Sequence, residues 1–73
     1  MNWGLTACVL IRLDARQGQW VGVDDLAGHL AAAPMLVRQE IERLWSQDQL
    51  AVQRDVVSGE VTHAQTPLDR VTP

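Results

Sequence analysis

Arginine and glutamine side chains cluster in the stretch from Pro34 to Trp45, which reads PMLVRQEIERLW. Arg38 follows Val37, an apolar residue at helical spacing, and therefore lies on the outward flank of the predicted helix. A guanidinium donates paired hydrogen bonds to a phosphate or to the edge of a guanine base. The alternative is that Arg38 and Arg43 pair with carboxylates such as Glu42 on a solvated helix face. Both interpretations stay open from the sequence.

The carboxylates, histidines and cysteine form no pattern typical of catalysis or metal binding. Asp24 and Asp25 are adjacent, so they point in different directions on a helix, and the helix dipole explains acidic residues at a helix start. His29 and His63 have no further ligand at suitable spacing. We therefore expect no enzyme, no cofactor and no metal site. Cys8, the single cysteine, cannot form an intrachain disulfide, and we expect it to be buried and inert.

Apolar residues at helical spacing predict three helices that position these side chains: Trp3 to Arg16, Val23 to Ala32, and Pro34 to about residue 47. The third has the strongest periodic signal, with Val37, Ile41 and Leu44 at i, i+4 and i+7. Pro34 suits its first turn, where a missing N–H costs nothing.

The period changes after Asp48, and this change predicts a β-hairpin. Leu50 and Val52 alternate with smaller or polar residues, VSG forms a turn, and Val61 to Ala64 is the return strand. A short extended segment, Gln19 to Val21, precedes the second helix, and Trp20 is expected to fill the core beside it. We expect one domain over residues 1–65 and a flexible tail over residues 66–73.

The first predicted helix is apolar on more than one side. Leu5, Val9 and Leu13 share one face, whereas Leu10 and Ile11 lie on other sides. A helix of this kind is usually covered on several faces, and so short a chain has too little protein to cover it. We therefore expect a homodimer through this helix, with another protein as the alternative partner.

Composition and charge restrict the partners. The chain has 73 residues and a formal net charge of −3, with six arginines and no lysine against nine carboxylates, whereas a dedicated nucleic-acid binder is usually basic. Its apolar run is too short to span a membrane, and its start is not typical of a signal peptide. The sequence therefore predicts a soluble, cytoplasmic protein.

A spaced set of apolar residues gives the chain a family resemblance. The stretch VDDLAGHLAAAPMLVRQEIERLWSQDQL resembles the reading domain of the DeoR and MarR groups of bacterial transcriptional regulators. The matching residues are Leu26, Ala27, Leu30, Val37, Arg38, Ile41, Leu44 and Leu50. The resemblance implies an α+β fold, a winged helix-turn-helix with three helices, a short strand and a C-terminal hairpin as the wing.

The sequence departs from this pattern where the third helix begins. Members of these groups commonly place a Ser or Thr N-cap and small polar residues there, whereas this chain has Ala33, Met35 and Leu36. Asp48 replaces the glycine that follows the helix and is expected to adopt a left-handed conformation. A weaker resemblance exists to the small FeoC-like winged-helix proteins, whose wing is rich in cysteine; this wing has none.

The resemblance implies double-stranded DNA as a partner, read by the third helix in the major groove. The expected contacts are Arg38, Gln39, Arg43 and, from the wing, Arg54. From Ala33 to Asp48 two arginines stand against three carboxylates, a net charge of −1 that weakens this prediction. The alternative is a protein interaction module, an adaptor or accessory subunit, with an apolar interface of Trp3, Leu10, Ile11, Met35, Leu36 and Trp45.

Overall fold

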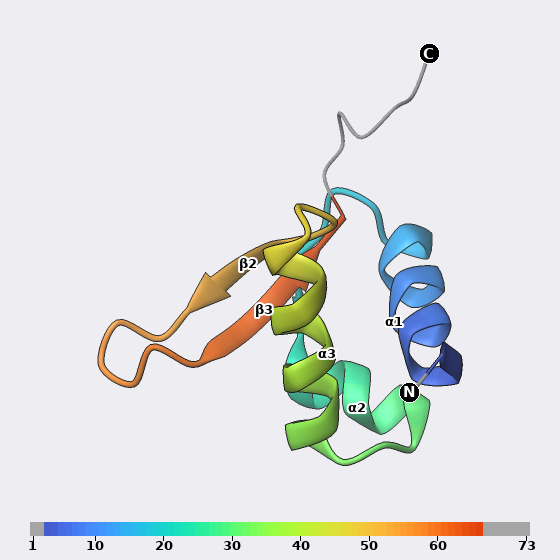
Figure 1. The fold of residues 1–73 in the computed structure, drawn as a ribbon, viewed down its shortest axis with the longest axis horizontal. Coiled ribbons are helices and arrows are strands. Elements are labelled where there is room, and N and C mark those ends of the chain that lie inside the picture. Colours follow the sequence, from blue (N-terminus) through green and yellow to red (C-terminus); the bar gives the residue numbers. More distant parts are fainter. Residues whose placement is uncertain (1–2, 67–73) are drawn as a thin grey trace.

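The computed structural model describes residues 3–66, whose elements are arranged as predicted. They are α1 (Trp3–Ala15), β1 (Val21–Gly22), α2 (Val23–Leu30), α3 (Pro34–Ser46), β2 (Ala51–Arg54) and β3 (Val61–Gln65). The ends of the helices and strands differ from the predicted ones by one or two residues. In Figure 1 the three helices gather on one side and the β2–β3 hairpin projects away from them. The predicted α+β architecture is confirmed.

The three strands form an antiparallel sheet in the order β1-β3-β2. Ala64 in the central strand pairs with Val21 on one side and with Val52 on the other. The pairing of β2 with β3 shifts between Gln53 and Arg54. Such an irregularity bends and twists the strand that carries it.

One core joins the helices to the sheet. Its buried apolar side chains are Val9, Leu13, Val21, Val23, Leu26, Ala27, Val37, Ile41, Leu44, Leu50, Val61 and Ala64. Leu26 and Ala27 of α2 belong to the same core as Val37, Ile41 and Leu44 of α3, as the spacing predicted. The core therefore fixes α3 relative to α2 and the sheet, and leaves the opposite face of α3 to solvent.

Two predictions about burial are wrong. Trp20, expected in the core, is 41% exposed, because the next residue, Val21, is the one that points into the core. Successive side chains of an extended segment alternate in direction, so Trp20 points outward. Cys8, expected to be buried, is exposed. It lies beside the Val9 and Leu13 row of α1, on a side that no other element covers completely.

The turn between α2 and α3 consists of Ala31, Ala32 and Ala33. Ala31 ends α2 in a left-handed conformation, with φ 52° and ψ 41°, and the Ala32 N–H bonds to the Ala27 carbonyl at 3.0 Å. Ala33 is extended and is followed by Pro34 at the start of α3. Asp48, after α3, has φ 59°, so its predicted left-handed conformation is confirmed.

The segment that follows β3 begins against α1. Thr66 is fully buried, and its hydroxyl donates a hydrogen bond of 3.5 Å to the Leu13 carbonyl. The rest of the predicted tail, residues 67–73, lies outside the described residues. Within residues 3–66, none of the helices has the length and apolar character needed to cross a membrane.

Candidate nucleic-acid interface

The outward face of α3 is mixed in character. Val37, Ile41 and Leu44 face the core, so at 100° per residue the opposite row points to solvent. This row consists of Met35, Gln39, Glu42 and Ser46. Met35 is 66% exposed and Gln39 is also exposed. The Glu42 carboxylate accepts from Arg54 and the Ser46 hydroxyl donates to the Arg43 carbonyl, so the amide of Gln39 is the polar group of this row that these bonds leave available, with the apolar Met35 near the start of the helix.

Arg38 lies on the flank of α3 that faces the sheet. Its Nε donates a hydrogen bond of 3.2 Å to the Val61 carbonyl of β3, and the side chain is half-buried. Among the described residues Arg38 makes no ion pair, so its two terminal nitrogens keep their donors for another acceptor. The guanidinium of Arg38 is thus fixed through Nε, while its two terminal nitrogens are available to donate hydrogen bonds to a ligand.

A cavity of about 350 Å³ lies beside Arg38, at the start of α2. It is lined by Gly22, Val23, Asp24, Arg38, Thr62 and His63. Gly22 is the N-cap of α2 and has no side chain to bond the first amides of that helix. The cavity therefore contains one cationic group, one carboxylate and the start of a helix. Within residues 3–66, neither this cavity nor any other place brings together three His, Cys, Asp or Glu side chains that could hold a metal ion.

Arg43 lies on the other flank of α3, where it connects this helix to α1. Its Nε donates to Glu40 Oε1 at 2.9 Å and its Nη2 donates to the Thr6 hydroxyl at 3.1 Å. Thr6 and Arg43 Nη2 also donate to Glu40. Burial of Glu40 raises the pKa of its carboxyl, but these hydrogen bonds and the charge of Arg43 outweigh burial, so that the pKa is lowered. Arg43 is therefore already paired.

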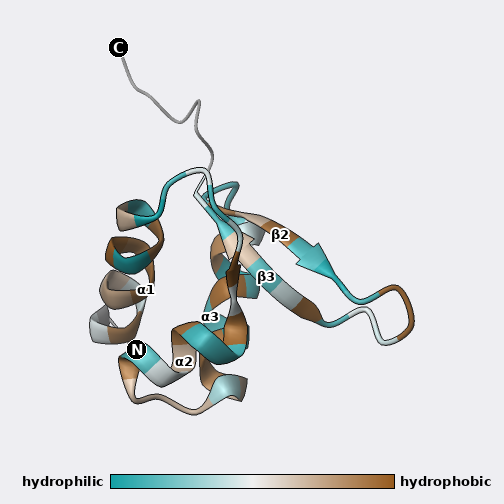
Figure 2. Ribbon diagram, turned by 180° about the vertical axis from the view of Figure 1, so that it is seen from behind, coloured by the Kyte–Doolittle hydropathy of each residue, from teal (hydrophilic) through white to brown (hydrophobic). Residues whose placement is uncertain are grey.

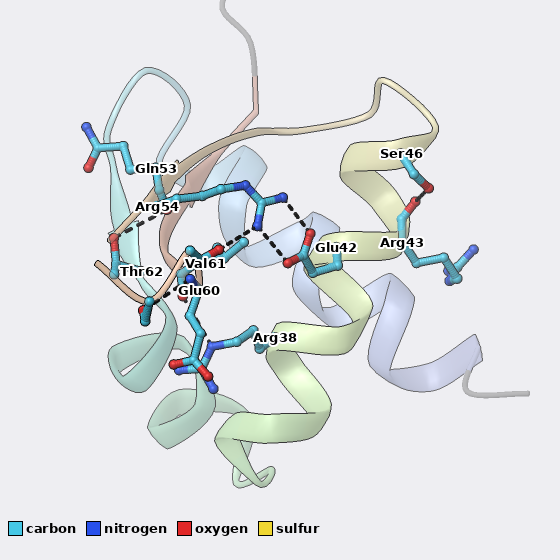
Figure 3. Close-up of polar contacts among 11 residues, drawn as sticks. Arg38, Glu42, Arg43, Ser46, Gln53, Arg54, Glu60, Val61 and Thr62 are labelled. Carbon is cyan, nitrogen blue, oxygen red and sulfur yellow. Dashed lines mark hydrogen bonds and ion pairs between the residues drawn. The ribbon is translucent and has the colours of Figure 1, made fainter. Parts of the chain in front are cut away.

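Arg54, on β2, is paired with a carboxylate of α3 (Figure 3). Its Nη1 and Nη2 donate to the two oxygens of Glu42 at 2.8 and 2.6 Å, and its guanidinium stands 4.7 Å from the ring centre of Trp45. The hydrogen bonds from Arg54 hold the pKa of Glu42 below its ordinary value and raise the pKa of Arg54 itself. The wing is thereby attached to α3.

The four side chains expected to contact DNA thus fall into two pairs. Arg38 and Gln39 make no ion pair within the described residues, whereas Arg43 and Arg54 are neutralised by glutamates. Glu40 and Thr6 were not predicted as partners of Arg43, although the i, i+3 spacing of Glu40 and Arg43 is a signal for such a pair. No signal in the sequence indicated the Val61 carbonyl as the partner of Arg38.

The side chains expected at a protein interface are also distributed over two surfaces. Met35, Leu36 and Trp45 are exposed on α3, and Ile11 is 69% exposed on α1. Leu10 is half-buried and packs against the core. Trp3 begins α1, and its side chain lies outside the described part of the structure.

No protein-family model and no curated protein matches this chain. Among solved structures, the chain is similar to the adhesin competence repressor AdcR from Streptococcus pyogenes, with a TM-score of 0.67 and 28% sequence identity. The match covers 88% of this chain and 46% of the AdcR chain, so the chain spans about half the length of that repressor. Together with the element order, this similarity shows that the chain has a winged helix-turn-helix fold of the kind found in a regulator.

Proposed function

We propose that this chain is a small DNA-binding transcriptional regulator of the bacterial cytoplasm, and that it places α3 in the major groove of duplex DNA. The observation that carries the proposal is the 28% identity to a repressor over 88% of the chain, in a fold that exposes α3 beside a wing. An α-helix fits the major groove, where base pairs are distinguished by their hydrogen-bonding groups.

Gln39 and Arg38 are the contacts that the geometry favours. Gln39 is exposed on the outward row of α3, and an amide side chain pairs with adenine through two hydrogen bonds. Arg38 is held through its Nε, so its terminal nitrogens are pre-positioned for a phosphate or a guanine. Arg43 and Arg54 contribute only after they exchange their glutamates for phosphates.

The negative net charge weakens the attraction of one copy to DNA, so dimer formation is important for this function. Non-specific affinity depends on the number of phosphates that are neutralised, and one copy offers few free arginines. A homodimer through α1 doubles that number, and the exposed Ile11 supports α1 as the contact surface. Light scattering on the protein and on Ile11→Asp tests this part: the protein is expected to exceed the monomer mass, whereas the variant is expected to be monomeric.

Fluorescence anisotropy with a labelled mixed-sequence duplex tests DNA binding. Affinity is expected to fall steeply between low and physiological salt, and Arg38→Ala is expected to weaken binding by about 1–3 kcal/mol. Arg16→Ala is the matched control, because it removes an arginine of equal charge outside α3 and the wing. Absence of binding even at low salt, or equal losses in both variants, would contradict the proposal.

The exposed apolar side chains of α3 favour a second candidate function, a protein interaction module. Met35, Leu36 and Trp45 lie on the helix that would otherwise read DNA, and apolar patches of this kind are typical of protein contacts. Under this alternative the protein does not bind duplex DNA, and Met35→Asp or Leu36→Asp abolishes the recovery of a protein partner while the fold is retained. Partner recovery that both variants retain would count against it.

A further inference from the structure

Two valines stand in solvent at the tip of the wing. Val56 is 99% exposed and Val57 is 92% exposed, and they lie between the carboxylates of Asp55 and Glu60. Figure 2 shows this hydrophobic turn at the end of the hairpin, on the opposite side of the molecule from α1. We call residues 55–60 the wing tip. It presents two apolar side chains with negative charge on both sides.

Hydrogen bonds fix the conformation of the wing tip. The Asp55 carboxylate accepts from the Val57 N–H at 2.7 Å and from the Ser58 N–H at 3.3 Å. The two ends of the turn are closed by Asp55 N–H to the Glu60 carbonyl at 2.9 Å and by Gly59 N–H to the Asp55 carbonyl at 2.8 Å. Because the wing tip is already ordered, it loses little conformational entropy when a partner binds it.

The charge of the wing tip does not suit DNA. Asp55 and Glu60 would approach phosphates of the same sign, and valines cannot replace the hydrogen bonds that phosphates make with water. An apolar surface with a basic rim is the complementary partner. The surface that fits this description within the described residues lies between α1 and α2.

The groove between α1 and α2 has an apolar floor. It has a volume of about 300 Å³ and is lined by Cys8, Ile11, Arg12, Ala15, His29 and Leu30. A cavity of roughly 150 Å³ is large enough to bind a benzene molecule, so this groove has room for two isopropyl groups. Ile11 and Cys8, which are exposed in a single copy of the chain, both line this groove.

The rim of the groove is basic. Arg12 Nη2 donates a hydrogen bond of 2.9 Å to His29 Nε2, while Arg12 Nε is buried without a hydrogen-bond partner. Among the residues that line the groove, Arg12 is the only one with a permanent charge. The groove carries the charge opposite to that of Asp55 and Glu60.

We infer that the groove between α1 and α2 binds the wing tip of a second copy of this chain. The inference rests on the proposed self-association through α1 and names the surface that covers that helix. Wing tip and groove lie at opposite ends of one molecule, so the contact forms between copies (Figure 1). In two antiparallel copies the contact is made twice, because each wing tip then lies at the groove of the other copy, and the two contacts close a symmetric homodimer.

Sedimentation velocity with two variants tests the inference. Val57→Asp places a charge on the tip, and Ile11→Asp places one in the groove; both residues are exposed, so the fold is expected to be retained. Each variant alone is expected to associate at least about tenfold more weakly than the natural chain, because a carboxylate would enter an apolar contact. A mixture of the two regains one intact tip and one intact groove, and is expected to form dimers and nothing larger.

Met35→Asp is the matched control, because it adds the same charge to an exposed apolar residue outside both surfaces. It is expected to associate like the natural chain. If Val57→Asp associates normally and Ile11→Asp does not, α1 pairs with α1 of the second copy and the wing-tip contact is refuted. If the natural chain stays monomeric over about a hundredfold range of concentration, self-association itself is refuted. DNA binding is measured separately, so its failure is distinguishable from both results.

Discussion

The guanidinium of Arg54 on the wing donates two hydrogen bonds to the carboxylate of Glu42 on α3, at 2.8 and 2.6 Å. Its Nη1 also donates to the Gly59 carbonyl at 3.0 Å, and the group stands over the ring of Trp45. A bidentate arginine–carboxylate pair has a fixed geometry. The pair therefore sets the position of the wing relative to α3 and occupies a charge that DNA would otherwise use.

Glu42→Gln is expected to increase the affinity for duplex DNA. The substitution removes a negative charge from the outward row of α3 and leaves Arg54 without its ionic partner. Affinity at low salt is expected to rise about fivefold. The slope of log affinity against log salt is expected to steepen by the amount that corresponds to about one more neutralised phosphate. Anisotropy titrations at several salt concentrations measure both quantities.

Asp48→Asn is the control for the change in charge. It also removes one carboxylate near the end of α3, and asparagine tolerates the left-handed conformation of this residue. Since Asp48 has no arginine partner among the described residues, its loss frees no cation, and the salt slope is expected to stay unchanged. Equal slopes for Glu42→Gln and the natural chain would show that Arg54 does not reach phosphate.

Glu40 is expected to make stability depend on pH in the acid range. Its side chain is 13% exposed and its pKa is lowered in the folded state by Arg43 and Thr6, which outweigh burial. A lowered carboxyl pKa stabilises the fold above the unfolded value of about 4.3, and this contribution is lost as pH falls through the folded pKa. We expect a contribution of about 1 kcal/mol, because the arginine is partly solvated.

Thermal melts of Glu40→Gln between neutral pH and about pH 3 test this expectation. The variant is expected to be less stable than the natural chain at neutral pH, and its Tm is expected to fall less as the solution is acidified. Glu60→Gln serves as the control, since Glu60 makes no ion pair with the described residues. If both variants follow the natural chain at every pH, the contact between Glu40, Arg43 and Thr6 contributes nothing to stability.

The fold was largely predictable because apolar spacing reports burial directly. Val37, Ile41 and Leu44 recur with the helical period and all three are buried. Trp20 was not predictable in the same way, because adjacent residues of an extended segment point to opposite faces, and the sequence does not show whether Trp20 or Val21 faces the core. Ala31 gave no signal for a left-handed turn, because alanine is a strong helix former.

The candidate site was predictable in the positions of its residues and less so in their partners. Arg38, Gln39, Arg43 and Arg54 do lie on α3 and the wing. Their availability depends on contacts between segments far apart in sequence, such as Arg54 with Glu42, and helical spacing carries no information about those contacts. Val57 lies in the predicted turn VSG, but a turn signal indicates where a chain reverses and not what its side chains contact, so the exposed apolar tip was not predicted.

Ala31→Gly is expected to stabilise the domain. Ala31 has φ 52°, where an alanine pays about 1–2 kcal/mol for contact between its Cβ and the backbone, while glycine adds about 0.5–1 kcal/mol of entropy cost. The net gain of about 0.5–1 kcal/mol corresponds to a rise in Tm of about 2–8 °C for a domain of this size. Ala32→Gly, at a neighbouring residue without positive φ, adds the entropy cost alone and is expected to lower Tm. If both substitutions lower Tm alike, then the chain does not turn between α2 and α3 through a left-handed residue 31, and the placement of α3 that this turn produces would have to be revised.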